Sequence, residues 1–213
     1  MKRSENIRLS KIHPGHFLVD LQCLWIIRGA VHQVQRFWSI SLKADSARKE
    51  MKNIAYLTEL DMFYDPFRVK DMIHFYETQF SDFRINKAWD LLKDMKIDRD
   101  KKIGKLSKGN RGRLKLALTL ARDAAVVLLD EPFSGLDPMV RESIVKSLLT
   151  YLELDKQTIV IATHEIHEIE QILDEVVVVL NGRIEEKKDV EQLREESGMS
   201  LLEWLKRFIE EKD

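Results

Sequence analysis

The sequence predicts an α/β fold, in which helices cover a parallel sheet and a separate helical subdomain is attached. From about residue 111 onward, apolar runs alternate with segments of helical periodicity, whereas residues 61–105 show helical spacing and no strong strand. The 213 residues, 44% of them apolar, are enough to bury one sizeable core. Residues 25–27 and 37–40 could form short strands, but the turn residues and glycines that a compact β-unit needs are scarce around them. The fold is therefore expected to be incomplete in its N-terminal part.

Three nearly continuous apolar runs predict parallel strands that helices cover on both faces. They span residues 125–129, 158–163 and 176–180. Residues 139–154 and 165–173 are long enough to supply the helical crossovers between them. Asn181 and Gly182 then predict a two-residue hairpin turn, which returns residues 183–186 as an antiparallel edge strand.

Helical periodicity predicts the subdomain and the C-terminal end of the chain. Asp65 followed by Pro66 predicts an N-cap and a first-turn proline for the first helix of the insert. Residues 201–209 place their apolar side chains on one helical face, for which packing against the same domain is expected in preference to a partner contact. The chain is therefore divided into a divergent N-terminal segment, a core that contains a helical insert at 61–110, and a C-terminal helical extension: residues 1–52, 53–184 and 185–213.

Composition and charge limit the functional classes. The 35 basic and 36 acidic residues are mixed along the chain, so no single-sign surface that would attract nucleic acid is expected. The apolar stretch at residues 16–30 contains Asp20, Gln22 and Arg28 and falls short of the about 20 apolar residues of a membrane helix. It also lacks the cleavage site of a signal peptide. The single Cys23 cannot form an internal disulfide, which fits a reducing cytosol.

The strongest chemical signal is an apolar run that ends in two adjacent carboxylates. Residues 124–132 read AAVVLLDEP, which places Asp130 and Glu131 at the carboxyl end of a predicted strand. Open parallel sheets bind ligands at that end. One carboxylate there can hold Mg²⁺, and the other can polarise a water for attack on a γ-phosphate. A strand that ends in solvated acids is also common, so this run alone does not identify a catalytic site.

Three further short motifs accompany the acidic run. Residues 106–110 (LSKGN) precede a helix that begins near Arg111, residues 134–138 (SGLDP) follow the acidic pair, and residues 162–165 (ATHE) end another strand. In this order and spacing, the four motifs resemble the signature motif, acidic strand, D-loop and switch histidine of the ABC ATPase family. The resemblance extends over about residues 54–184 and implies a P-loop NTPase-type core.

The resemblance implies roles for individual residues. Asp130 corresponds to the metal-associated carboxylate, Glu131 to the general base and His164 to the sensor of the γ-phosphate. Asp137 corresponds to the residue that signals across the dimer. General-base catalysis contributes roughly 10²- to 10⁴-fold in rate, so Glu131→Gln is expected to remove most turnover in a competent assembly.

The signature motif also has a physical interpretation. The Ser107 hydroxyl and the backbone N–H groups around Gly109 lie at a predicted helix N-terminus, where donors and the helix dipole favour a phosphate. By resemblance, this surface faces the ATP held by the opposite subunit. Asn110 stands in place of the more usual glutamine. Lys108 stands in place of a common glycine and adds positive charge.

A metal-binding role is also considered for Glu59. Residues 54–59 resemble the strand that leads into the family's Q-loop, where a glutamine is expected in the position of Glu59. A carboxylate can still accept a metal-bound water, although it changes the local charge.

The phosphate-gripping loop of such a subunit is missing. Its pattern, G-x-x-x-x-G-K-[ST], has no match upstream of the acidic run, and residues 104–109 come nearest but overlap the signature motif. Tight binding of ATP by this chain alone is not expected, because each lost charge-assisted hydrogen bond costs about 1.5–3 kcal/mol. Three explanations are left open: a degenerate subunit that completes a partner's ATP site, a truncated cassette, or a 5′ region read in a shifted frame.

The resemblance implies an ATP-hydrolysing subunit of an ABC transporter, with ATP and Mg²⁺ as cofactors. The expected partners are a separate membrane permease and a second ABC ATPase subunit, in a homo- or heterodimer, and no nucleic acid. The expected location is the cytoplasmic face of the membrane, through the permease. Two alternatives are a degenerate or truncated subunit without independent ATPase activity, and a soluble ABC ATPase that works outside transport.

Overall fold

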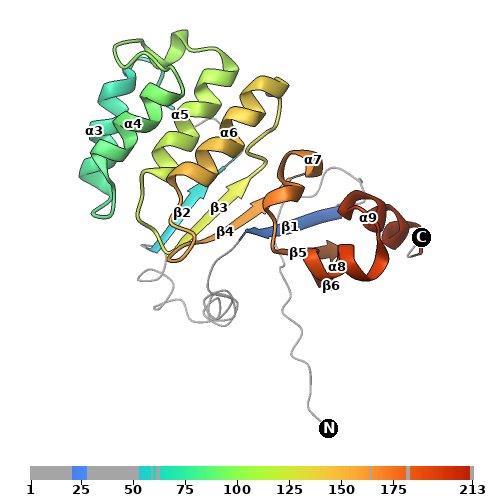
Figure 1. Ribbon diagram of the computed structural model, residues 1–213. Coiled ribbons are helices and arrows are strands. Elements are labelled where there is room, and N and C mark those ends of the chain that lie inside the picture. The colour runs from blue at the N-terminus through green and yellow to red at the C-terminus, as the bar shows by residue number, and fades with distance from the viewer. Residues whose placement is uncertain are drawn as a thin grey trace.

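The computed structural model describes residues 21–27, 53–58, 60, 63–163, 165–180 and 183–211. In this part of the chain, a six-stranded sheet forms the centre of the molecule, in the order β2-β3-β4-β1-β5-β6 (Figure 1). The strands are β1 (Leu21–Ile27), β2 (Ile54–Leu57), β3 (Val126–Asp130), β4 (Thr158–Ala162), β5 (Glu175–Leu180) and β6 (Arg183–Asp189). The three apolar runs are confirmed as β3, β4 and β5, whose ends differ from the predicted ones by one residue at most.

The strand directions place the carboxylates at one rim of the sheet. β2, β3 and β4 pair in parallel, so their carboxyl ends share a rim, and Asp130 lies there at the end of β3. This rim is called the acidic rim below. β6 runs antiparallel to β5 with Arg183 opposite Leu180, which confirms the predicted antiparallel edge strand, and the strand continues three residues further than predicted. Asn181 and Gly182, for which the two-residue turn is predicted, lie outside the described residues.

Strand β1 inserts between β4 and β5 and runs antiparallel to both of them. Leu24 pairs with Ala162 and Ile27 pairs with Ile159. The carboxyl end of β1 therefore lies at the rim opposite Asp130. Of the two short strands considered in the N-terminal segment, the one at residues 25–27 is part of β1, and residues 37–40 lie outside the described residues.

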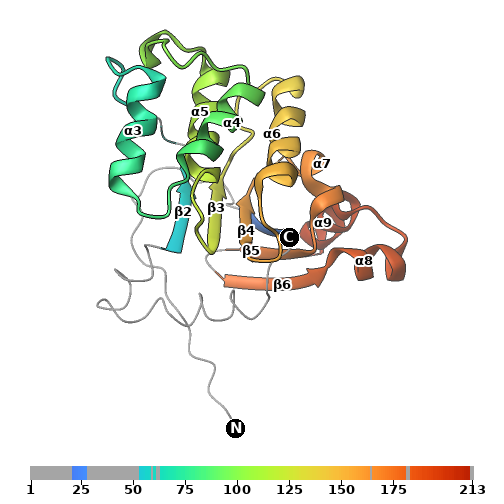
Figure 2. The same cartoon turned by 60° about the vertical axis from the view of Figure 1, so that its left-hand side comes forward.

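The helices gather in two groups around the sheet. They are α3 (Val69–Gln79), α4 (Ile85–Asp94), α5 (Lys108–Leu120), α6 (Pro138–Tyr151), α7 (Ile166–Ile169), α8 (Val190–Ser197) and α9 (Leu201–Glu210), with 3₁₀ turns at η2 (Ile103–Lys105) and η3 (Glu170–Ile172). Figures 1 and 2 show α3 and α4 packed with α5, which lies beside β2, and α8 beside β6 at the other side of the sheet. The helices of the insert thus reach the sheet through α5.

The start of the insert differs from the prediction. Asp65 does not cap α3, which begins after Arg68, whose backbone N–H donates to a side-chain oxygen of Asp71 at 2.8 Å. Asp65 instead forms an ion pair with Arg111 at 2.8 Å, and its carbonyl accepts the N–H of Gly104 at 3.1 Å. A tertiary contact has therefore taken the place of the local cap that the sequence pattern suggests.

A buried arginine joins the insert to the sheet. Arg122 is 6% exposed, and its Nε and Nη2 donate to the two carboxylate oxygens of Asp82 at 3.0 and 2.9 Å. Its Nη1 donates to the Ile54 carbonyl at 2.8 Å, and the guanidinium lies 4.1 Å from the centre of the Phe80 ring. One side chain thus connects the end of α5, the α3–α4 connection and strand β2.

The C-terminal helix packs on its own domain, as predicted. Leu201 and Leu205 are buried, and the rings of Trp204 and Phe208 stack with centres 5.5 Å apart against the core. Among the helices of the described ranges, none has the length and apolar character needed to cross a membrane.

Candidate functional site

Asp130 lies at the tip of β3, with parallel neighbours on both sides. Its Oδ2 accepts the hydroxyl of Tyr56 on β2 at 3.1 Å. Partial burial and the Asp130 carboxylate raise the pKa of the Tyr56 phenol, so the phenol keeps its proton at neutral pH and donates it to this bond. Tyr56 therefore orients the carboxylate that the sequence analysis associated with a metal, and sequence reasoning did not identify it.

Glu131 follows Asp130 in a constrained conformation. Its φ of 45° lies in the left-handed region, which costs a residue with a side chain of order 1–3 kcal/mol and is enriched at functional sites. Contacts with β4 and the segment after it hold the residue: its N–H donates to the Ala162 carbonyl at 2.8 Å, and its Oε2 accepts the Thr163 hydroxyl at 3.1 Å. The carboxylate is thereby fixed beside the end of β4.

Thr163 is a second residue that sequence reasoning missed. It is 4% exposed, and the same hydroxyl oxygen that donates to Glu131 accepts the N–H of Glu165 at 3.1 Å. The Thr163 side chain therefore ties the chain on both sides of position 164 to the acidic rim. His164 and Glu59 themselves lie outside the described residues, and their roles stay predictions.

The signature corner, defined here as Ser107, Gly109 and Asn110, forms the first turn of α5. The helix begins at Lys108, three residues earlier than predicted, and the Ser107 oxygen accepts the N–H of Asn110 at 3.3 Å as its N-cap. Ser107 is exposed, so its hydroxyl proton can reach a ligand. The corner thus combines a hydroxyl and a helix N-terminus, two groups that favour a phosphate.

The D-loop connects the acidic rim to α6. Asp137 caps α6 by accepting the N–H of Val140 at 3.1 Å, which is a structural function in addition to the signalling role predicted for it. Arg141 donates from Nε to the Leu136 carbonyl at 3.0 Å and from Nη1 to a Glu165 carboxylate oxygen at 2.5 Å. Arg141 therefore joins the D-loop to the segment that follows β4, a long-range contact for which the sequence carries no signal.

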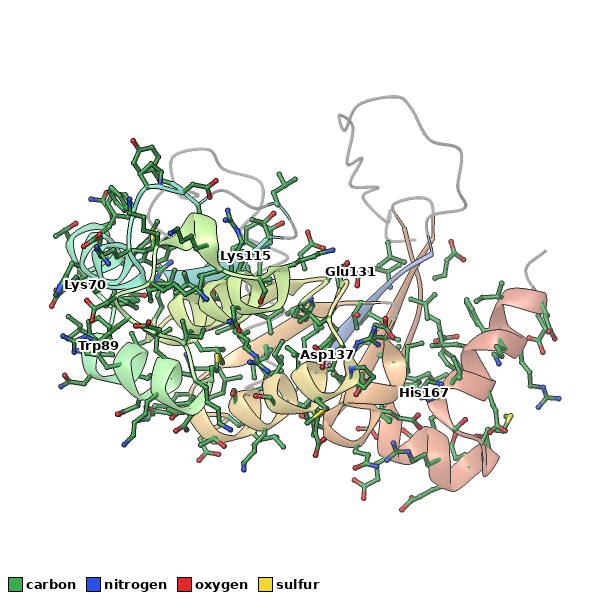
Figure 3. All side chains as sticks on the ribbon, turned by 90° about the horizontal axis from the view of Figure 1, so that it is seen from above. Lys70, Trp89, Lys115, Glu131, Asp137 and His167 are labelled. Atoms are coloured by element: carbon green, nitrogen blue, oxygen red, sulfur yellow. The ribbon has the colours of Figure 1, made fainter. Side chains whose placement is uncertain are left out.

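A cavity of about 180 Å³ borders Glu131 on the side of α5. Figure 3 shows Lys115 on α5 and Glu131 in this region, with Asp137 at the start of α6 and His167 further along on α7. Lys115 donates from Nζ to the carbonyls of Thr58 at 2.9 Å and Leu60 at 3.4 Å, the two residues that flank Glu59. His167 is exposed on α7 and takes no part in the acidic rim.

The donor set at the rim suits Mg²⁺ that arrives with a nucleotide. Within the described ranges, no group of three or more His, Cys, Asp or Glu side chains is arranged to hold a metal ion. Mg²⁺ keeps several waters and is commonly bound through one or two carboxylates together with substrate phosphates. Asp130, fixed by Tyr56, fits that requirement as the protein's contribution.

Comparisons with known proteins agree with the motifs. The family model described as "ABC transporter" matches residues 26–134. The chain is 26% identical over 148 residues to the ABC transporter ATP-binding protein YtrB of Bacillus subtilis, a match that covers 70% of this chain and 51% of YtrB. It is 35% identical over 101 residues to the thiamine import ATP-binding protein ThiQ of Shigella flexneri, with 47% of this chain and 44% of ThiQ covered. The chain therefore spans about half the length of these relatives.

Two solved structures share the fold. One is an ATP-binding subunit of an ABC transporter, with a TM-score of 0.66, 20% identity, and 75% of this chain and 70% of that chain covered. The other is a dimeric ATP-binding cassette in a post-hydrolysis state with ADP and Pi. Its TM-score is 0.58 and its identity 19%, and the match covers 70% of this chain and 68% of that chain. These likenesses confirm the predicted fold class, an α/β core with a parallel sheet of the kind found in ATP-binding cassettes.

Proposed function

Because the chain belongs to the ABC transporter family, we propose that it is an ATP-binding and ATP-hydrolysing subunit of a transporter. The observation that carries this proposal is the acidic rim, where Asp130 and Glu131 emerge from the tip of a parallel strand and Thr163 holds Glu131 in place. The rim and the signature corner are the two surfaces on which such a subunit contacts ATP. Mg²⁺, when bound with ATP, would neutralise charge on the phosphates.

The chain's own residues take separate parts in the reaction. With Mg²⁺ bound together with ATP, Asp130 would accept hydrogen bonds from water on the metal, and Glu131 would remove the proton of the water that attacks the γ-phosphate. His164 and Glu59 follow β4 and β2 in the chain and are proposed to contact the γ-phosphate and the metal's water shell. Asp137 is proposed to signal across the dimer.

ATP is proposed to lie between two subunits. The carboxyl end of β1 points to the rim opposite Asp130, so β1 does not bring a phosphate loop to the acidic rim. Donors from a second cassette, including its signature corner, would supply what this rim lacks. A dimer is also the form of the solved cassette with ADP and Pi. The second cassette would be another copy of this chain or a different subunit.

The membrane partner is proposed to be a separate permease, which would hold this chain at the cytoplasmic face of the membrane. ThiQ is named as an import ATP-binding protein, which supports a transport role for this chain but not thiamine as its substrate. The proposed organisation keeps a divergent segment at 1–52, a core at 53–184 and a helical extension at 185–213. The family match includes part of the first segment, because it begins at residue 26.

A second candidate is a degenerate subunit that contributes only its signature corner to an ATP held by its partner. The direction of β1 and the missing G-x-x-x-x-G-K-[ST] pattern favour this candidate. It differs from the first proposal because the acidic rim, including Glu131, would then have no part in turnover.

The partners can be identified by purifying the tagged chain from detergent-solubilised cells with and without Mg-ATP. We expect a membrane permease and an ABC ATPase subunit to co-purify, with more of the second cassette retained when ATP is present, because the nucleotide bridges the two subunits. Recovery of ribosomes or DNA in place of a membrane protein would contradict the transporter role and favour a soluble ABC ATPase.

A further inference from the structure

The cavity of about 180 Å³ beside Glu131 is lined on one side by three cations. Lys108, Arg111 and Lys115 are residues of α5, and Glu131 and Ser134, before and in the D-loop, also line the cavity. We propose that this cavity, called the cationic pocket below, binds a phosphate group within this one chain. Its use for a phosphate of ATP rests on the proposed function, whereas its capacity to bind inorganic phosphate does not.

The three cations share one face of α5 because they are three and four residues apart along the helix. Two of them are held in position by other groups. Arg111 forms an ion pair with Asp65 at 2.8 Å, and Lys115 donates to the Thr58 carbonyl at 2.9 Å. Side chains that are already ordered lose little conformational freedom when a ligand arrives, so this arrangement favours binding.

Lys108 is the cation that closes the pocket toward the D-loop. Its ammonium group lies against Gly135, where a Cβ would collide with it. Gly135 has a φ of +65°, a conformation that glycine adopts without strain. In the described part of the chain, Lys108 has no carboxylate partner within ion-pair distance. Its charge is therefore not offset locally, and by resemblance the family has a glycine at this position.

The charges favour an oxyanion over a cation. Three positive side chains face one carboxylate in the pocket, and Asp65, which balances Arg111, is not among the lining residues. The Ser134 hydroxyl adds a neutral donor. A tetrahedral phosphate can accept hydrogen bonds from several directions at once, which suits donors that converge from a helix and a loop.

The location gives the pocket a use in the proposed reaction. A phosphate in the pocket would lie next to Glu131, the residue proposed to activate water. The sequence lacks the lysine of the usual phosphate loop, and Lys108 together with Lys115 would supply positive charge from α5 in its place. The negative charge of Glu131 opposes a bound phosphate, so its removal is expected to strengthen binding.

The test is a calorimetric titration of potassium phosphate into the full chain at constant ionic strength. We expect saturable binding with a dissociation constant of about 1 mM, weakened about tenfold by Lys108→Gln and strengthened severalfold by Glu131→Gln. Lys105→Gln is the matched control, because Lys105 is an exposed lysine three residues earlier and does not line the pocket. Circular dichroism of each variant checks that the fold is retained.

Absence of saturable binding, or equal weakening by Lys108→Gln and Lys105→Gln, would overturn the proposal. Competition experiments identify the source of the phosphate. Displacement of bound inorganic phosphate by Mg-ATP but not by ADP indicates that the pocket takes the terminal phosphate of ATP, whereas no displacement by either nucleotide indicates that it takes free phosphate. Both results retain the pocket. A chain that binds phosphate but never hydrolyses ATP in its assembly would refute the proposed function and leave the cationic pocket intact.

Discussion

Replacing Glu131 by glutamine is expected to lower ATP turnover by the assembled cassettes about 10²- to 10⁴-fold without weakening nucleotide binding. The amide has the size of the carboxylate and can still accept the Thr163 hydroxyl, so the local structure is kept. It cannot take up the proton of the attacking water. The measurement is phosphate release under saturating Mg-ATP, with ATP affinity determined in parallel.

The control for this variant is Glu142→Gln, which neutralises an exposed glutamate on α6 away from the acidic rim. We expect it to retain full turnover. If Glu131→Gln also retains full turnover in an assembly that requires this chain, the acidic rim is not the catalytic surface. The degenerate-subunit candidate would then describe the protein better.

Replacing Arg122 by alanine is expected to destabilise the fold by about 3 kcal/mol. This is the low end of the range for breaking a buried ion pair, and it applies here because Asp82 keeps some contact with water. The substitution leaves the Asp82 carboxylate and the Ile54 carbonyl without the guanidinium donors, and it removes the contact with Phe80. For a chain of this size, the loss corresponds to a fall in Tm of about 6–12 °C.

Arg84→Ala provides the comparison for this prediction. Arg84 forms an ion pair with Asp123 at 2.5 Å, but its side chain is 60% exposed, and exposed ion pairs contribute little to stability. The two variants should therefore differ clearly in thermal unfolding. Equal and small shifts would mean that Arg122 does not join the insert to the sheet in solution.

The sequence was sufficient for the parts of the fold that depend on local patterns. Strands β3, β4 and β5 and the β5–β6 hairpin follow from apolar runs and a turn pair. Strand β1 could not be placed, because its position between β4 and β5 depends on pairing with residues more than 100 positions away. The predicted start of α3 at Asp65 was wrong because Asp65 pairs with Arg111 in the tertiary structure and does not cap the helix.

The site was predictable in its motifs but not in its supporting contacts. Asp130, Glu131, Ser107 and Asp137 could be named because their order in the chain follows a family pattern. Tyr56 and Thr163 could not, because each acts through a hydroxyl that reaches a carboxylate from a neighbouring strand or the segment after it. The left-handed backbone at Glu131 also has no sequence signal, since glutamate rarely adopts it.

ATP is proposed to lie between the acidic rim of one cassette and the signature corner of another. Calorimetry of Mg-ATP binding with two variants of Gly109 is the direct test of this arrangement. A Cβ at this position would meet only Leu136 Cδ2 at 3.9 Å, so Gly109→Ala fits, whereas Gly109→Asp adds a negative charge where ATP phosphates are expected. We predict no micromolar binding by the isolated chain. The complex with its second cassette should show micromolar binding that Gly109→Ala retains and Gly109→Asp weakens at least about tenfold. Micromolar binding by the chain alone, or equal affinities for the two variants in the complex, would contradict the account.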